Sequence, residues 1–216
     1  MDSYSKGYID ALVDAQSHID GYFFLEESLS PALLDAMQKV CPITPNQDGA
    51  ETPAYVYSHY FLGRRATALA RIDLLNKLSQ NFDVTVYTHA DCKDILPTAI
   101  YGGKIDYYDT MPTVFQHSKI NLNITLKTIQ TGIPLRAWDI LGCSGFLLTN
   151  FQQELCDFFI PGEDFVYYES PPDAIEKAAY FLSHDRERQE IAHNAFEKIA
   201  ASHTFHHRVQ SMFDII

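Results

Sequence analysis

The chain has 216 residues, of which 46% are hydrophobic and 20% are charged, a composition typical of globular domains and not of disordered or coiled-coil proteins. A folded chain of this length buries about 70% of its unfolded surface, which is enough for one sizeable core. The 16 Lys and Arg residues against 28 Asp and Glu residues give a net charge of −12, which disfavours nucleic acid and anionic membrane surfaces as partners.

The cysteines and the hydropathy of the chain indicate its compartment. Cys41, Cys92, Cys143 and Cys156 are widely separated and form no CxxC pair, which favours free thiols in a reducing compartment over a disulfide or zinc framework. The amino-terminal sequence MDSYSKGYIDALVDA lacks an apolar signal-peptide core. No stretch approaches the roughly 20 apolar residues that a membrane helix needs. We therefore predict a cytoplasmic protein without a membrane span.

Residues 1–80 are predicted to form a helical segment. Ser30 and Pro31 are typical of the cap and first position of a helix. The prolines of residues 42–53 predict a loop that ends this helix and that is the best internal boundary. Apolar residues recur at helical spacing in three stretches, at residues 8–13, 33–40 and 69–78.

Residues 81–216 change to short β-rich runs that alternate with helical stretches. Strands are predicted at residues 83–88, 119–125, 145–150 and 164–169. Helices are predicted near residues 111–118, 134–143, 152–159, 171–183, 185–201 and 204–215. This alternation is typical of a parallel sheet covered by helices, so the sequence predicts an α/β layer structure.

A window without acidic residues is the most informative part of the chain. No Asp or Glu occurs in residues 110–138, and the same window holds Lys119, Lys127 and Arg136. A predicted strand, a loop and a helix that begins at Pro134 follow one another there. In open parallel sheets, ligands bind beyond the carboxyl ends of strands, where a helix N-terminus attracts phosphate. The window predicts a site for an anionic ligand, most simply a diphosphate; a buried sheet centre would also lack acids.

Three polar side chains are candidate ligand contacts. Asn121 and Asn123 lie two residues apart on the predicted strand and therefore share one face. They could bind a nucleotide or sugar, or fix a neighbouring loop. Asp139 lies three residues after Arg136, so these two share a helix face. The Asp139 carboxylate could accept the hydroxyls of a ribose, or it could form an ordinary surface ion pair.

Two further patterns are given structural roles. The GCSG run from Gly142 to Gly145 is expected to end a helix and turn directly into a strand, with glycine as the left-handed residue and as the point of close approach. His203, His206 and His207 are spaced to share one side of a helix, and we interpret them as a solvated or interdomain face and not as a metal site. The sequence has no GxGxxG, P-loop or GxSxG motif.

Several blocks, in order along the chain, resemble one protein family. The strongest are INLNIT, GIPLRAWDILGCSGFLLTN, PGEDFVYY and HTFHHRVQ, and GYIDALVDAQ and ALARIDLLNKLSQNFDVTVYTH also match. Together they resemble the carboxyl-terminal half of group 1 glycosyltransferases of the GT-B fold, in the branch of CgeB-like or spore-maturation-like proteins. The resemblance covers nearly the whole chain.

The resemblance implies a fold and an activity. The fold is α/β, with a Rossmann-like parallel sheet flanked by helices, in which residues 1–80 are a helical segment packed on a nucleotide-sugar-binding domain of residues 81–216. The activity is transfer of a sugar from a nucleoside diphosphate sugar to an unknown acceptor, without a cofactor or metal. No catalytic residue is assigned. The implied donor-site residues are Asn121, Asn123, Lys127, Thr131, Gly132, Ile133, Arg136 and Asp139.

One position departs from the family pattern. Related retaining transferases carry two glutamates eight positions apart, the first near the donor sugar and the second on the ribose. Thr131 and Asp139 stand at those positions here. Because Thr131 has no carboxylate, the stereochemical outcome and the donor stay open. The alternatives are a non-catalytic protein-interaction or structural module of the same fold, and a flavodoxin-like mononucleotide binder.

The expected partners follow from the same resemblance. Members of the family carry an acceptor-binding domain in front of the donor domain, so we expect this chain to be the donor half of a longer protein, with low sugar-transfer activity or none by itself. The acceptor, whether a glycan, a protein or a cell-surface molecule, is not identified. The family's first strand of this domain is also missing, which would leave a neighbouring strand edge open. We therefore expect the segment to self-associate.

Overall fold

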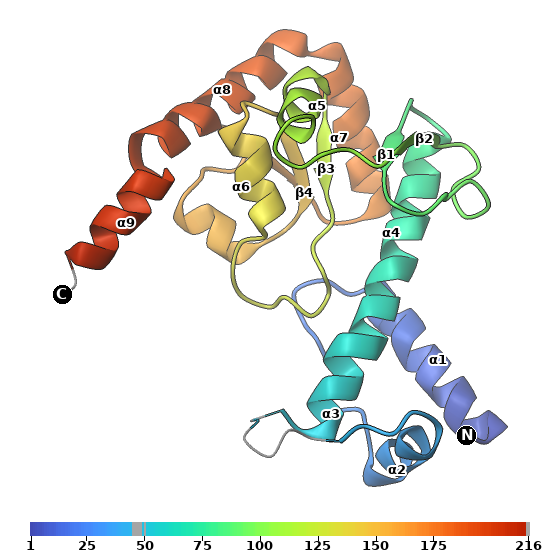
Figure 1. Cartoon of the computed structure of the whole chain (residues 1–216). Coiled ribbons are helices and arrows are strands. Elements are labelled where there is room, and N and C mark those ends of the chain that lie inside the picture. The colour runs from blue at the N-terminus through green and yellow to red at the C-terminus, as the bar shows by residue number, and fades with distance from the viewer. Residues whose placement is uncertain (45–48, 50, 215–216) are drawn as a thin grey trace. The chain divides into compact units, whose positions relative to one another are not determined.

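The structure is a computed structural model that describes residues 1–44, 49 and 51–214 (Figure 1). The chain divides into two compact units, Met1–Leu74 with Thr125–Gln130, and Leu75–Ile124 with Thr131–Ile216. We describe each unit by itself. The expected division after residue 80 remains a prediction.

The first unit is helical. Its helices are α1 (Ser3–Ser17), α2 (Pro31–Val40), α3 (Pro53–Tyr55), the π-helix η1 (Val56–Leu62) and the first part of α4 (Gly63–Ser79). The Ser30 hydroxyl accepts the Leu33 N–H and Pro31 stands in the first turn of α2, which confirms the predicted helix start. Part of the predicted loop, residues 45–48 and 50, lies outside the described residues. The core consists of Ile9, Val13, Phe23, Leu25, Leu29, Leu33, Tyr57, Leu62 and Ala66.

The second unit contains two parallel sheets. In one, β1 (Thr85–Tyr87) pairs with β2 (Ile100–Gly103). In the other, β4 (Leu147–Asn150) lies between β3 (Asn121–Asn123) and β5 (Val166–Tyr168). All four predicted strands are present, and the parallel pairing confirms the predicted α/β class. The short, glycine-rich strand β2 was not predicted.

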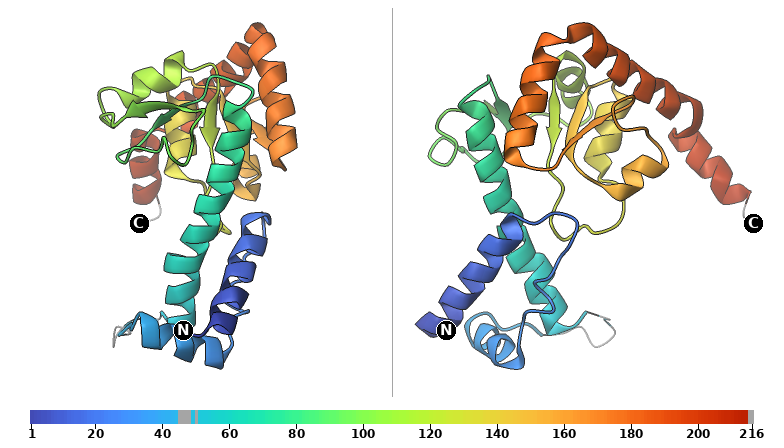
Figure 2. Two further views of the ribbon diagram at one scale, coloured as in Figure 1. Left: turned by 90° about the vertical axis from the view of Figure 1, so that its right-hand side faces the viewer. Right: turned by 180° about the vertical axis from the view of Figure 1, so that it is seen from behind.

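Helices cover both faces of the three-stranded sheet. The helices α5 (Met111–His117) and α6 (Leu135–Gly142) lie on one face, and α7 (Pro171–Ser183) lies on the other (Figures 1 and 2). The long helix α8 (Asp185–Ser202) packs against α6 and α7 and leads into α9 (Phe205–Phe213). The helix predicted near residues 152–159 is a short 3-10 helix, η2 (Gln153–Asp157). None of the described helices is both long and apolar enough to cross a membrane.

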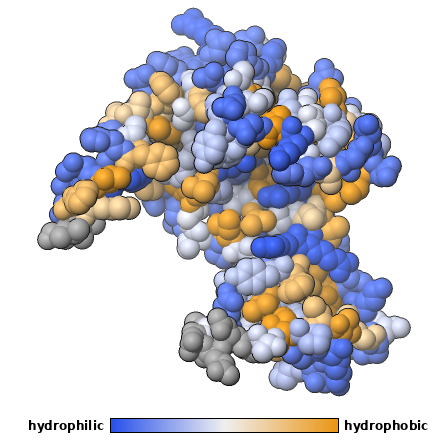
Figure 3. All heavy atoms as spheres, viewed as in Figure 1, coloured by the Kyte–Doolittle hydropathy of each residue, from blue (hydrophilic) through white to orange (hydrophobic). Residues whose placement is uncertain are grey.

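The core of the second unit lies between the sheet and α6. Every residue of β4 is buried, as is usual for a central parallel strand that is covered on both faces. The buried side chains of this core are Ala137, Ile140, Leu141, Leu147, Leu155, Phe159, Phe165 and Ala195. By contrast, the apolar side chains of α9, among them Phe205, Met212 and Phe213, are exposed (Figure 3).

The turn from α6 into β4 confirms the close approach that the GCSG run predicts. A Cβ atom on Gly145 would lie 2.8 Å from the Asn121 Nδ2 atom and 3.0 Å from the carbonyl oxygens of Ile140 and Phe115. The left-handed residue, however, is Ser144, with a φ of 57°. Glycine is therefore required here for space and not for its backbone conformation.

The prediction that three histidines share one helix side is wrong. His203 follows the last turn of α8, whereas His206 and His207 belong to α9. The His203 ring lies 5.3 Å from the Trp138 ring, and its Nδ1 accepts a hydrogen bond from Arg208 at 2.9 Å. Burial, with smaller effects of Arg208 and His207, lowers the pKa of His203. The ring is thus part of the joint between two helices.

Candidate functional site

The loop from β3 to α6 leads to the helix start that was predicted to bind phosphate. Gly132 has a φ of +93°, a conformation that favours glycine, and Thr131 beside it is exposed. Ile133 packs against the core. Pro134 precedes α6 in a non-helical conformation, and no side chain of the described residues caps the helix there. The first N–H groups of α6 therefore lack a side-chain partner that would compete with a ligand.

Two charged residues stand on the outer face of α6. The helix buries Ala137, Ile140 and Leu141, which leaves Arg136 and Asp139 on the other side, as the spacing predicts. Their side chains are 41% and 26% exposed, and 4.0 Å separates Arg136 Nη1 from Asp139 Oδ2. This distance is the upper limit for an ion pair, so the two groups are neighbours without a close hydrogen bond.

The carboxylate of Asp139 is held by a residue that the sequence analysis missed. The Tyr107 hydroxyl donates a hydrogen bond of 2.8 Å to Asp139 Oδ1. Tyr107 lies between β2 and α5, 32 positions before its partner. This hydrogen bond raises the pKa of the Tyr107 phenol, and burial and the Asp139 charge add to the effect. The phenol therefore stays protonated at neutral pH and remains a donor to Asp139.

Arg136 lies against side chains of α5 and of the segment before it. Its guanidinium carbon is 5.4 Å from the centre of the Phe115 ring and 6.0 Å from that of Tyr107, which is within the range of cation–π attraction. Arg136 Nη1 also donates to Met111 Sδ. We call Tyr107, Met111, Phe115, Arg136 and Asp139 the Arg136–Asp139 site.

One sequence signal could have indicated Tyr107. Pro112 in a predicted helix of residues 111–118 marks a helix start, just as Pro134 does. In a parallel sheet, the helices that follow strands begin at the carboxyl edge. The residues before both helix starts are therefore expected at the same edge, and Tyr107 is one of them.

Asn121 and Asn123 share one buried side of β3, as predicted, but both bind other parts of the protein. The Asn121 amide donates to the carbonyl of Phe115 at 2.9 Å, and the Asn123 amide donates to the Thr149 hydroxyl at 3.0 Å. Only 6% and 5% of these residues are exposed. Their contacts favour the second of the two interpretations, in which they fix neighbouring segments.

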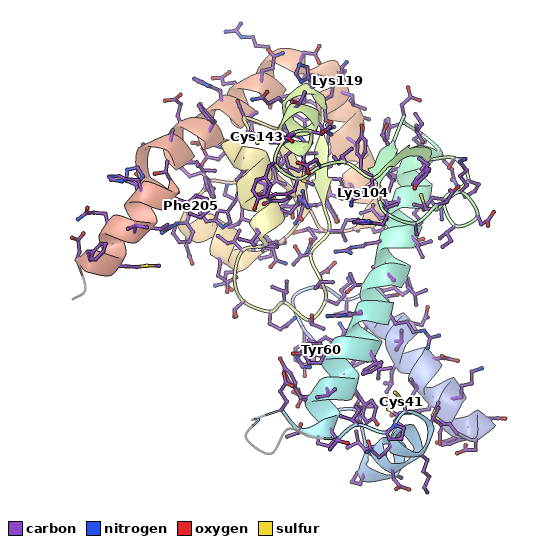
Figure 4. The ribbon with its side chains drawn as sticks, viewed as in Figure 1. Cys41, Tyr60, Lys104, Lys119, Cys143 and Phe205 are labelled. Atoms are coloured by element: carbon purple, nitrogen blue, oxygen red, sulfur yellow. The ribbon has the colours of Figure 1, made fainter. Side chains whose placement is uncertain are left out.

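The three cations of the acid-free window each meet a carboxylate. In the first unit, the buried Lys127 Nζ donates to Asp20 at 2.7 Å. In the second, Lys119 Nζ lies 3.9 Å from Asp185. Figure 4 shows Lys119 near α5, at the end of β3 that is remote from the loop to α6. Of these three cations, Arg136 is therefore the one at the start of α6, and its carboxylate neighbour, Asp139, lies 4.0 Å away.

The residues that the structure describes contain no group of three or more His, Cys, Asp or Glu side chains that could hold a metal ion.

A comparison with protein families bears on what this site does. The family model described as Glycosyl transferase-like matches residues 65–214, which is more than half of the chain. The chain belongs to the glycosyl transferase-like family. The match includes every residue of the Arg136–Asp139 site, and membership of this family supports sugar transfer as the general activity. Neither the curated proteins nor the solved structures include a match to the chain.

Proposed function

We propose that this glycosyl transferase-like chain is the donor-binding part of a GT-B glycosyltransferase of the CgeB-like branch, and that its donor is a nucleoside diphosphate sugar. The observation that carries the proposal is the Arg136–Asp139 site, in which a cation and a carboxylate lie one turn apart at the start of a helix that follows a parallel strand. A nucleoside diphosphate offers the complementary groups, which are an anionic diphosphate and ribose hydroxyls.

Each charged residue of the site has a role in this proposal. Arg136 and the first N–H groups of α6 bind the diphosphate, because both the guanidinium and the positive end of the helix attract anions. Asp139 accepts a hydrogen bond from a ribose hydroxyl. During transfer an acceptor hydroxyl oxygen forms a bond to the sugar carbon and releases its proton to solvent. The bond between that carbon and the diphosphate oxygen breaks, and its electron pair stays on the diphosphate. Arg136 stabilises the charge that develops there.

The remaining predicted residues surround or support this centre. In the proposal, Thr131 and Gly132 approach the sugar, because both are exposed on the loop before α6. Asn121, Asn123 and Ile133 support the loop and its neighbouring strand through the contacts described above. Lys127 belongs to the first unit, where its Nζ donates to Asp20, and its ligand contact stays a prediction from the sequence.

The proposal also includes a compartment and an acceptor. All four cysteines are free thiols, which supports a reducing compartment, and we propose the cytoplasm. We further propose that the acceptor is bound by a separate domain that precedes the donor domain.

Ligand binding to the 216-residue chain tests the function. We would titrate UDP, ADP, GDP, CDP, pyrophosphate and flavin mononucleotide up to millimolar concentration, with saturation-transfer NMR and calorimetry as readouts. We expect one nucleoside diphosphate to bind at least about ten times more tightly than pyrophosphate, which corresponds to 1.4 kcal/mol. Preference for flavin mononucleotide would indicate a flavodoxin-like binder, and no binding at all would indicate a non-catalytic module.

A further inference from the structure

Tyr107 touches both charged residues of the Arg136–Asp139 site. Its hydroxyl donates to Asp139 Oδ1 at 2.8 Å, and its ring centre lies 6.0 Å from the Arg136 guanidinium carbon. Tyr107 is 44% exposed, and it packs edge-on against Tyr108 with ring centres 5.0 Å apart. The residue therefore connects the two predicted ligand groups at the surface of the protein.

Without Tyr107, Arg136 and Asp139 would bind each other, and a ligand would have to displace that ion pair. Arginine and a carboxylate on one helix face readily form a close pair with two parallel hydrogen bonds at about 2.7–2.9 Å. In this structure Arg136 and Asp139 stay 4.0 Å apart. Tyr107 accounts for the separation in two ways, because its hydroxyl occupies one carboxylate oxygen and its ring lies beside the guanidinium.

The hydrogen bond also decides which oxygen of Asp139 is offered to a ligand. A carboxylate has two equivalent oxygens and can turn about its terminal bond. Tyr107 occupies one lone pair of Oδ1, so Oδ2 is the oxygen with both lone pairs open to a hydroxyl, and the Asp139 side chain as a whole is 26% exposed. Contact with a ribose is then made through one fixed oxygen.

We propose that Tyr107 is a positioning residue of the donor site. It fixes the Asp139 carboxylate for a ribose hydroxyl and keeps Arg136 from closing onto that carboxylate, so that the guanidinium remains available to the diphosphate. This inference rests on the proposed function of the site. It adds that the preference for ribose over deoxyribose depends on a tyrosine that itself does not touch the hydroxyl.

The test compares ribonucleotides with deoxyribonucleotides. The probes are the tightest-binding of UDP, ADP, GDP and CDP, and its 2′-deoxy and 3′-deoxy counterparts. They are titrated against the parent chain, Tyr107→Phe, Asp139→Asn and the double variant. Tyr108→Phe is the matched control, because Tyr108 is the adjacent tyrosine and is 82% exposed.

We expect the parent to prefer the ribonucleotide over one deoxy counterpart by about tenfold, the effect of one hydrogen bond to a charged group. Tyr107→Phe should reduce this preference to less than about threefold, and the double variant should show no further loss relative to Asp139→Asn. Tyr108→Phe should retain the full preference. These results together would support the positioning role.

Two other results would overturn the inference, and they are distinguishable. If Tyr107→Phe weakens the ribonucleotide and both deoxynucleotides equally, the tyrosine has only a structural role, while the proposed function stands. If the parent binds none of the four diphosphates, the proposed function is wrong and the role of Tyr107 falls with it.

Discussion

Replacing Arg136 by alanine would test the diphosphate contact directly. The residue stands in the first turn of α6, with Phe115, Tyr107 and Met111 around its guanidinium. If this guanidinium binds the diphosphate, the variant should lose affinity for the nucleoside diphosphate and retain its fold. A residue that only packs against the rings would show the opposite, a loss of stability without a loss of affinity.

The two magnitudes can be worked out separately. A hydrogen bond to a charged group contributes about 1.5–3 kcal/mol, and because 41% of the Arg136 side chain is exposed, we expect the lower end, a rise in Kd of about tenfold. An exposed cation–π contact contributes about 0.5–1 kcal/mol, and a surface ion pair contributes less than about 1 kcal/mol. The melting temperature of a chain of this size should therefore fall by only about 2–4 °C per kcal/mol lost.

The assay is a calorimetric titration with the preferred nucleoside diphosphate, together with thermal unfolding of each variant. Lys119→Ala is the matched control. Lys119 is a second cation of the acid-free window, but it lies at the amino end of β3 and pairs with Asp185 of α8. The control should bind as the parent does. If Arg136→Ala is folded and binds the nucleoside diphosphate as tightly as the parent does, the phosphate assignment is refuted.

Three further predictions concern stability and association. Gly145→Ala should lower the free energy of unfolding by about 1–3 kcal/mol in urea titration, because its Cβ would meet two carbonyl oxygens at 3.0 Å, whereas Gly142→Ala, whose nearest contact is at 4.0 Å, should not. Because the pKa of His203 is lowered in the folded protein, the unfolded chain takes up the proton first, and stability should decline as pH falls below about 6.5. His203→Gln should reduce that decline in thermal scans, and an equal decline in both proteins would contradict the reasoning. Open strand edges should make the chain self-associate, which light scattering would detect as a mass above 24.6 kDa. Tyr87→Lys places a charge on β1 at a side chain that is 42% exposed, and it should reduce the self-association. A parent chain that stays at 24.6 kDa at all concentrations would contradict the prediction.

Local chemistry in the sequence was sufficient to place most elements. Ser30 and Pro31 predict the start of α2, and Pro171 predicts the start of α7, because a cap or a first-turn proline acts within a few residues of itself. The four predicted strands follow from β-branched and apolar runs in the same way. The strand β2 escaped prediction because four residues with two glycines carry little β preference.

The partners of the charged residues could not be predicted in this way. Lys127 meets Asp20 from 107 positions away, and Asp139 meets Tyr107 from 32 positions away. The acid-free window therefore looked like a surplus of positive charge, although carboxylates from distant parts of the chain, Asp20 and Asp185, lie near Lys127 and Lys119. Spacing along the chain carries no information on these pairings.

The sequence by itself thus determined the class of the fold, the starts of α2, α6 and α7, and the position of Arg136 and Asp139 on one helix face. Only the tertiary structure decided that Tyr107 holds Asp139 and that Asn121 and Asn123 bind inward. The physical reason is the range of the interactions. Helix periodicity and capping depend on residues three or four positions apart, whereas a hydrogen bond between elements depends on how strands are ordered and how helices pack on them.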